Sequence, residues 1–317
     1  MNRSPARFLA VPVALAIATA IGLTAAGCGG EERQGEEGRS ESSPSVSPPA
    51  SSVPSSVSRS APRPAPGPPM SAAIPALAAA YGDLNKALAD VGANQKVALA
   101  ILPVGRPAEP IVFGDIDPPQ VAWSSIKVAL AVAAERHHGG PMPATVAAIT
   151  ASDNAAAQSL WRSLGDDRQA AAAVTRVLRE GGDDRTTVPA VAKRPPYSIF
   201  GQTVWPVANA ARFTAGFACL PDAGRVRTLM GRVDGNQRWG ADKLKSKTEV
   251  KGGWGPGRSS GYVVRQIAVI THRDGSQTAV AMVTFGTGTT MATGTTALDH
   301  VGVWLSRNAR NLPRGFC

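Results

Sequence analysis

The pattern of apolar and polar residues divides the chain into three parts. Residues 8–26 form an almost uninterrupted apolar run that follows two arginines and ends in the stretch LTAAGC. Residues 29–70 are dominated by Gly, Glu, Ser and Pro, and they hold too few apolar side chains to offset the entropy of ordering a chain. From Ser71 to Cys317 apolar positions recur with helical and strand spacing, over a length that suits one domain with a full core.

Within residues 71–317 the spacing predicts a helix, two strands, a helical block, three strands and a last helix. The expected helices are residues 74–92, the run from Ser124, and 144–150, 155–164, 169–179, 206–218, 224–233 and 297–306; the expected strands are 96–104, 110–115, 247–252, 262–272 and 278–285. This order indicates an α+β domain with one five-stranded antiparallel sheet flanked by helices, plus a helical subdomain. The stretch FGTGTTMATGTT lacks the lysine of a phosphate loop, so we interpret it as a turn.

The apolar leader predicts export. Its end, AAGC, resembles a bacterial lipobox, although Ala25 stands where that pattern usually has Leu. The resemblance implies a signal peptide over residues 1–28, lipidation of Cys28, and anchoring to the outer face of the cell membrane. Residues 29–70 would be a disordered Ser/Pro-rich tether. The alternative is an ordinary cleaved signal with an incidental cysteine.

Charge and cysteine content narrow the partners. The formal net charge is +10, and residues 1–70 hold six arginines and five glutamates, so nearly all of it lies on the folded part. This excess favours anionic surroundings; an exported chain has little access to nucleic acid, so cell-wall polymers or lipid headgroups fit better, and a role in solubility alone fits equally. Cys219 and Cys317 remain as a pair that an oxidising compartment would join in a disulfide, the alternative being two buried thiols.

The first candidate for chemistry is WSSIK, which opens an apolar run. Ser124 and Lys127 lie three apart and so share one face of a helix, whereas Ser125 points elsewhere. A serine hydroxyl needs an adjacent base to become a nucleophile, and a desolvated lysine can be that base. The alternative is a helix N-cap at Ser124 with Trp123 as a staple, but the helix dipole disfavours a lysine in a first turn.

Two further motifs follow along the chain. Ser152-Asp153-Asn154 would by itself be a helix cap, and Lys251, before Gly252 and Gly253, would by itself be an edge-strand lysine at a turn. The adjacent His137 and His138 precede Gly139 and suit a helix end better than metal ligation. We therefore expect neither a metal nor a cofactor.

Taken in order, SSIK, SDN and KGG resemble the Ser-x-x-Lys, Ser-Asp-Asn and Lys-Thr/Ser-Gly signature of class A β-lactamases and penicillin-binding proteins. The chain also resembles β-lactamase-related lipoproteins of actinobacteria. The resemblance covers nearly all of residues 71–317 and implies the family's fold. For catalysis it implies Ser124 as the acylated nucleophile, Lys127 as its base and Ser152 as the proton relay. For substrate binding it implies Asn154 as a partner of the substrate amide and the lysine, Lys251 as positive potential for a substrate carboxylate, and Gly253 and Trp254 at the substrate-binding edge. The N–H groups of Ser124 and Trp254 would form the oxyanion hole.

Three departures from that family shape the functional prediction. The two motif serines are only 28 residues apart, so a segment beside the site is missing and the cleft should be more open. The third motif lacks its hydroxyl residue, and Trp254 could supply an apolar wall instead. No Asp or Glu occurs between Arg185 and Pro221, where the deacylating glutamate would lie; Glu180 and the pair Asp183-Asp184 suit exposed or turn-capping positions. Without that base, an acylated serine should deacylate slowly.

The sequence therefore predicts an exported, lipid-anchored serine acyl-enzyme protein that acts on, or is acylated by, cell-wall peptides or β-lactam-like amides. The alternative is a catalytically weak or inactive lipoprotein that keeps the fold to bind a cell-wall ligand or a protein partner. An efficient, broad β-lactamase ranks third. The physiological substrate and the oligomeric state do not follow from the sequence.

Overall fold

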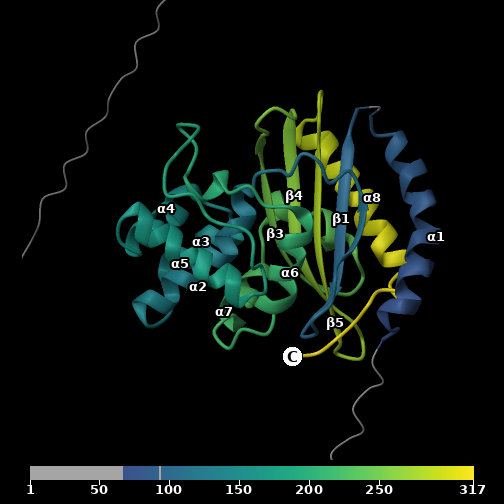
Figure 1. Ribbon diagram of the computed structural model, residues 1–317, viewed down its shortest axis with the longest axis horizontal. Helices are drawn as coiled ribbons and strands as arrows, with labels where there is room; N and C mark the ends of the chain where they lie inside the picture. The colour runs from purple at the N-terminus through teal and green to yellow at the C-terminus, as the bar shows by residue number, and fades with distance from the viewer. Residues whose placement is uncertain (1–66, 93) are drawn as a thin grey trace, which may run out of the picture. The chain divides into compact units, whose positions relative to one another are not determined.

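A computed structural model describes residues 67–92 and 94–317 (Figure 1). Cys28 and most of the expected tether lie outside the described residues. The helices are α1 Met70–Ala89, α2 Lys127–His138, α3 Pro143–Thr150, α4 Asn154–Ser163, α5 Asp167–Glu180, α6 Val207–Phe217, α7 Gly224–Met230 and α8 Met291–Arg307. The strands are β1 Lys96–Pro103, β2 Ile111–Gly114, β3 Lys247–Pro256, β4 Tyr262–Thr271 and β5 Gln277–Gly286. Within these described ranges, none of the helices has both the length and the apolar content to cross a membrane.

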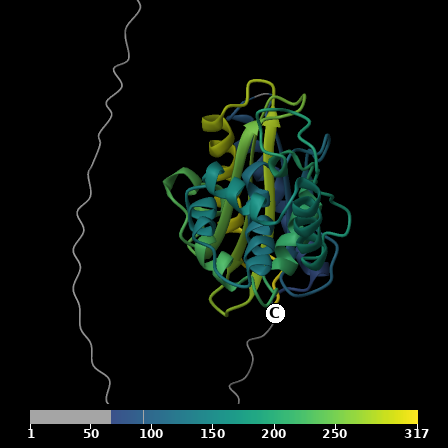
Figure 2. The same cartoon turned by 90° about the vertical axis from the view of Figure 1, so that its left-hand side faces the viewer.

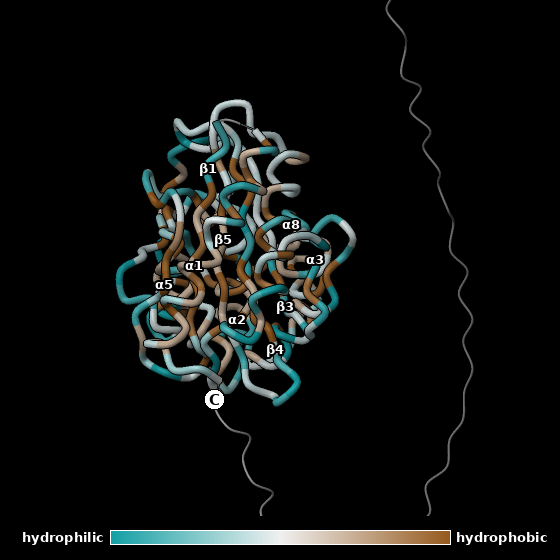
Figure 3. Tube along the Cα trace, turned by 90° about the vertical axis from the view of Figure 1, so that its right-hand side faces the viewer, coloured by the Kyte–Doolittle hydropathy of each residue, from teal (hydrophilic) through white to brown (hydrophobic). Residues whose placement is uncertain are grey.

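The five strands form one antiparallel sheet, as the sequence predicts, and their order in it is β2-β1-β5-β4-β3. Alternate residues of β1 point to opposite faces: Ala98 packs into the core beneath the helical block, whereas Leu99 packs into the core beneath α1 and α8. Because both faces are covered, the central strands are apolar at nearly every position instead of alternating. Figure 1 shows the two helical layers on either side of the sheet, and Figure 3 shows the apolar segments gathered toward the middle of the domain.

The helical block covers one face of the sheet (Figure 2). Its central helix, α2, is buried at every position from Lys127 to Ala134. This explains why the run is apolar on all sides, and it makes the lysine at the helix start an exception. The helix ends at Gly139, which takes the left-handed conformation (φ 77°) common at helix ends, so the exposed His137 and His138 close a helix as expected.

Several element boundaries differ from the sequence prediction. Helix α8 begins at Met291 and not at Ala297, because the Thr290 side chain caps it by accepting a hydrogen bond from the Thr293 N–H. Interpreting the whole Gly/Thr-rich stretch as a turn was therefore wrong from Met291 onward. Strand β3 runs through its glycines to Pro256 and does not end at Gly252, since the glycines serve a close approach to the site and not a turn. Met70, assigned to the tether, is the first residue of α1.

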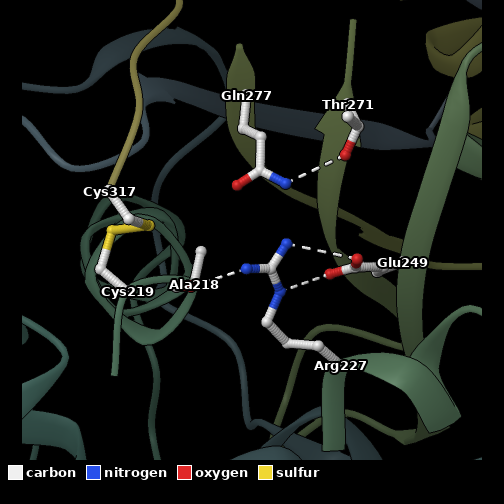
Figure 4. Close-up of a disulfide and its surroundings, with 7 residues drawn as sticks. All are labelled: Ala218, Cys219, Arg227, Glu249, Thr271, Gln277 and Cys317. Carbon is white, nitrogen blue, oxygen red and sulfur yellow. Dashed lines mark hydrogen bonds and ion pairs between the residues drawn. A yellow bond between two sulfur atoms is a disulfide. The ribbon is translucent and has the colours of Figure 1, made fainter. Parts of the chain in front are cut away.

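The C-terminus is tied to the helical block (Figure 4). Cys317 forms a disulfide with Cys219, just after α6, with a Cα–Cα distance of 5.2 Å, which is the pairing that the cysteine count predicts. Nearby, Arg227 of α7 donates to both carboxylate oxygens of Glu249 on β3 at 2.7 and 3.2 Å, and to the Ala218 carbonyl at 2.7 Å. A two-point guanidinium–carboxylate pair of low exposure fixes direction as well as distance. Strand β3 is thereby fastened to α7 of the helical block.

Candidate active site

The nucleophile candidate lies on a tight turn in front of α2. Residues Trp123–Ile126 form a 3-10 turn, η1, and the Lys127 N–H bonds to the Ser124 carbonyl. Because a 3-10 turn has three residues, Ser124 and Lys127 lie one above the other. Ser124 is half-buried and its hydroxyl makes no hydrogen bond within the described residues, so it is not a helix cap. Ser125 is wholly buried and donates to the Ala122 carbonyl at 2.6 Å, which leaves Ser124 as the accessible serine.

The residue before Ser124 is strained. Trp123 has φ 46°, in the left-handed region that bulky side chains seldom occupy. Its indole is buried, meets the ring of Tyr197 edge-on with 5.0 Å between centroids, and has an unpartnered Nε1. Such backbone strain costs about 1–3 kcal/mol and persists only where the surrounding packing holds it. Here the held conformation presents the Ser124 side chain to the solvent side of the turn.

Lys127 is a buried lysine with oxygen partners but no ion pair. Its side chain is fully buried, and Nζ donates to the Ser152 carbonyl at 2.6 Å, the Asp153 carbonyl at 3.1 Å and Asn154 Oδ1 at 2.8 Å. Burial lowers the pKa of Lys127 to about 7, against a smaller upward effect of the Asp153 charge. The neutral amine, which can accept a proton, is therefore well populated near neutral pH. The structure has no hydrogen bond between Lys127 Nζ and the Ser124 hydroxyl, although the two residues are stacked.

The second motif supplies both a cap and site residues. Asp153 caps α4 by accepting the Ala156 N–H at 2.6 Å. This cap leaves Asn154 free to hold Lys127, as the resemblance implies. Ser152, with φ 60°, offers its carbonyl to Lys127 and its hydroxyl to Lys251 Nζ, 2.9 Å away. Ser152 therefore bridges the two lysines.

Lys251 lies deeper than an edge-strand lysine. Although β3 is the edge of the sheet, Lys251 is fully buried and donates to Ser152 Oγ, Gln237 Oε1 and its neighbour's carbonyl at Gly252. Burial, and next the charge of Lys127, lower the pKa of Lys251 well below its usual range. With its three N–H groups engaged, the lysine holds Ser152 in place.

Gly253 sets the spacing between β3 and the nucleophile turn. A Cβ at Gly253 would lie 2.8 Å from the Ala122 carbonyl oxygen and the Ser125 nitrogen, and 2.9 Å from the Ser124 nitrogen. These are backbone atoms that cannot swing aside, so only glycine permits the approach. The close approach brings the residue after Gly253, Trp254, next to Ser124, where two N–H groups could serve a developing oxyanion.

A cleft of about 450 Å³ opens over this constellation. Its lining combines the two motif serines, an amide pair and an aromatic and proline wall: Trp123, Ser124, Ser152, Asn154, Gln158, Pro196, Tyr197, Ser198, Trp254, Gly255, Pro256 and Tyr262. The structure thus brings together all three motifs, and Trp254 lines the cleft as an apolar wall. The two lysines lie behind the lining and not in it.

None of the described residues that line the cleft carries a carboxylate. Asp183 is buried and accepts from the Thr186 N–H at 3.0 Å and from Trp205 Nε1 at 2.8 Å, so it caps the loop between α5 and α6. Asp184 is exposed, and Glu180 pairs with Arg136 at the surface. In the part of the chain that the structure describes, no three His, Cys, Asp or Glu side chains lie where they could hold a metal ion.

Sequence reasoning missed four residues of this site. Gln158 lines the cleft one helical turn after Asn154, a spacing that could have revealed it. Gln237 holds Lys251 from a short turn far along the chain, and Tyr197 and Tyr262 form cleft walls from a loop and a strand start. No local pattern identifies these three, because only the folded chain brings them to the cleft.

Comparison with known proteins yields similarity of fold. No known family profile matches the chain, and no curated protein sequence matches it. Among solved structures, a β-lactamase from Burkholderia vietnamiensis is similar at 20% identity with a TM-score of 0.55, over 73% of this chain and 96% of that one. A β-lactamase from Streptosporangium roseum is similar at 15% identity and 0.54, over 74% and 99%.

A third similar structure is a variant of the class A β-lactamase of the last common ancestor of Gram-negative bacteria, bound to the transition-state analogue 5(6)-nitrobenzotriazole. It has 19% identity and a TM-score of 0.53, over 72% of this chain and 98% of that one. The match covers nearly the whole of each solved chain. The chain therefore has the fold of the class A β-lactamases.

Proposed function

We propose that this chain is an exported, lipid-anchored serine acyl-enzyme protein that is acylated at Ser124 and deacylates slowly. The observation that carries the proposal is the fully buried Lys127, whose pKa lies near 7, stacked below an unbonded serine hydroxyl at the mouth of a cleft. A buried lysine without a carboxylate partner is costly to fold around. A role for Lys127 as the base for Ser124 would account for that cost.

In the proposed acylation, the Ser124 oxygen attacks a substrate carbonyl while its proton passes to Lys127. A C–O bond to Ser124 forms, and the negative charge on the carbonyl oxygen is held by the N–H groups of Ser124 and Trp254. The tetrahedral species then breaks its bond to the leaving group. That group takes its proton through Ser152, whose hydroxyl is kept in place by Lys251.

Deacylation would need a second general base for water. The lining of the cleft offers an amide at Gln158 but no carboxylate, and an amide cannot take up a proton near neutral pH. Loss of a positioned base costs about 10²–10⁴ in rate. Turnover of amides and β-lactams should therefore be slow, and the acyl-enzyme should accumulate.

The test is intact mass spectrometry of the purified chain after exposure to the methyl ester of benzylpenicillin and to an activated phenylacetyl thioester. We expect an adduct on Ser124 that persists after removal of the probe. Ser124→Ala should abolish it, whereas Ser198→Ala, a serine on the wall of the same cleft, should leave it intact. Acylation at Ser124 would be refuted if the wild-type protein formed no adduct, or if the wild type and Ser124→Ala formed it equally.

One observation favours a second function, a non-catalytic binding or scaffold lipoprotein. All three N–H groups of a charged Lys127 would be taken by oxygens of the second motif, and none of its bonds reaches Ser124. In that case the cleft would hold a cell-wall ligand by its aromatic walls without reaction. Reversible ligand binding that survives Ser124→Ala, with no adduct from any probe, would identify this function.

The anchoring part of the proposal rests on the sequence of residues 1–28 alone. We expect the protein in the membrane fraction, released by detergent and not by salt, with a diacyl or triacyl group on Cys28. Cys28→Ser should move the protein out of that fraction. A wild-type protein that is soluble without detergent would contradict the lipid anchor.

A further inference from the structure

Among the residues that the structure describes, those that line the cleft above Ser124 are all uncharged. Its walls consist of aromatic, proline, serine and amide residues, with Tyr197, Trp254 and Tyr262 as the large apolar groups. A ligand carboxylate that enters such a cleft gives up its hydration and gains no opposite charge. The lining alone therefore favours an uncharged ligand.

The lysine that would attract a carboxylate does not line the cleft but lies behind Ser152, which does. Lys251 is fully buried, does not line the cleft, and spends its N–H groups on Ser152, Gln237 and the Gly252 carbonyl. A carboxylate would have to displace one of these oxygens from the buried ammonium to reach it. Lys251 therefore serves to hold Ser152 and Gln237 in place.

The hydroxyl that would help bind a carboxylate has no room either. A Cβ on Gly252 would lie 2.8 Å from Cζ2 of Trp239 and 3.3 Å from Cζ3 of Trp254. Trp239 is buried and its Nε1 is tied to the Asn236 carbonyl at 3.0 Å. Two indole rings thus occupy the space that a serine or threonine side chain would need.

Arg194 lies near the cleft, and its guanidinium is engaged by aromatic rings and a backbone carbonyl. The Arg194 guanidinium lies over the Tyr197 ring, 5.2 Å from its centroid, and over the Trp123 ring at 6.0 Å. Two of its nitrogens donate to the Pro256 carbonyl at 3.2 Å. This contact clasps the loop that carries Tyr197 to the end of β3, so Arg194 stiffens the aromatic wall of the cleft.

We propose that the substrates that acylate Ser124 are neutral esters or thioesters with a flat apolar acyl group, and that substrates with a carboxylate beside the scissile carbonyl react poorly. This inference rests on the proposed function. The aromatic walls hold the acyl group by its faces, and the uncharged lining selects against the anion. In the reaction, the Ser124 oxygen forms the new ester bond, the carbon–sulfur bond of a thioester breaks, and the thiol leaves with the proton that Ser124 gave up.

The experiment compares three thioesters by the rate at which the Ser124 adduct grows in intact mass spectra of the folded chain. The first probe is the phenylacetyl thioester of methyl thioglycolate, which is neutral. The second is the phenylacetyl thioester of thioglycolic acid, which differs only by a free carboxylate on the leaving thiol. The third is the acetyl thioester of methyl thioglycolate. Each rate is divided by the rate of the same probe with a small amino alcohol, which removes differences in intrinsic reactivity. We expect the neutral phenylacetyl probe to react at least tenfold faster than its free acid and about tenfold faster than the acetyl probe.

Two variants separate recognition from general damage. Tyr197→Ala removes an aromatic wall and should lower the phenylacetyl-to-acetyl ratio about fivefold. Tyr81→Ala removes a tyrosine from α1, on the opposite face of the sheet, and should leave the ratio unchanged. An equal fall in both variants would overturn the assignment of the aromatic wall.

The outcomes also separate this inference from the proposed function. If the free acid reacts as fast as the ester or faster, the neutral-substrate inference is overturned while acylation at Ser124 stands. A preference for the free acid that disappears in Arg194→Gln would overturn it in the same way and would assign the carboxylate to that guanidinium. If none of the three probes modifies Ser124, the proposed function fails, and the substrate class fails with it.

Discussion

Acylation of Ser124 should depend on pH through Lys127. An unperturbed lysine, with a pKa of about 10.4, is neutral in only about 4 molecules in 10,000 at pH 7. Burial lowers the pKa of Lys127 to about 7, so that about half of the molecules carry the neutral base at that pH. Burial therefore increases the reactive fraction about a thousandfold. The acylation rate should rise about tenfold between pH 6 and pH 8 and then level off.

The assay is the initial rate of adduct formation by a neutral thioester from pH 5.5 to 9.5, measured by acid quench and intact mass. Ser124→Ala supplies the background at each pH. A second variant, Asp153→Asn, keeps an oxygen that can cap α4 and removes the charge that raises the pKa of Lys127. Its profile should shift to lower pH, because the ammonium loses an attractive partner.

Two results would refute this reasoning. A rate that rises tenfold per pH unit up to pH 9.5 without a plateau would show hydroxide, and not Lys127, as the base. A plateau in the wild type that shifts to higher pH in Asp153→Asn would contradict the sign of the charge effect.

Four further outcomes test other parts of the structure. Gly253→Ala should slow acylation about a hundredfold with little change in probe affinity, because its Cβ would push β3 away from the Ser124 nitrogen; an unchanged rate would remove Trp254 from the oxyanion hole. Gln158→Glu should shorten the lifetime of the Ser124 adduct, measured as its decay after removal of the probe, and decay equal to the wild type would place this residue outside reach of the ester. Replacing Cys317 by Ser opens a crosslink between residues 98 apart and should cost about 4 kcal/mol in the free energy of unfolding, visible as a lower midpoint in denaturant; an unchanged midpoint would contradict a bridged native state. Between the lowered and the usual pKa of Lys127, the unfolded chain binds more protons than the folded chain. The free energy of unfolding, measured by chemical denaturation, should therefore rise between about pH 7 and pH 10, by up to about 1.4 kcal/mol per pH unit. A fall over that range would contradict the burial of Lys127.

The sheet and the motif order could be predicted because they depend on local pattern. Strands buried on both faces give apolar runs, as in β1 and β5, and a lysine in the first turn of an apolar helix stands out against it. The same local pattern did not predict where β3 ends or where α8 begins. Gly253 and Gly255 of β3 are required by contact with the nucleophile turn, and Thr290, just before Met291, serves as a cap.

The motif residues of the candidate site could be predicted from the sequence, but their hydrogen bonds and the other residues of the cleft could not. Spacing selects Ser124 over Ser125, and the structure agrees, since Ser125 is buried and bonded. The orientation of Lys251 toward Ser152 and Gln237 depends on a contact between residues far apart in sequence. The aromatic wall likewise requires Tyr197, whose position is set by Arg194 and the end of β3.

The Trp239 indole beside Gly252 limits which substitutions could give this cleft a carboxylate-binding hydroxyl. A single replacement of Gly252 by serine or threonine would restore the third motif on paper, yet the new Cβ would meet the Trp239 ring at 2.8 Å. The ring is buried and tethered, so it cannot move aside without loss of packing. The two positions are therefore coupled: a route from this cleft to one that binds a carboxylate must change Trp239 first or at the same time, and screens of single substitutions would not find it.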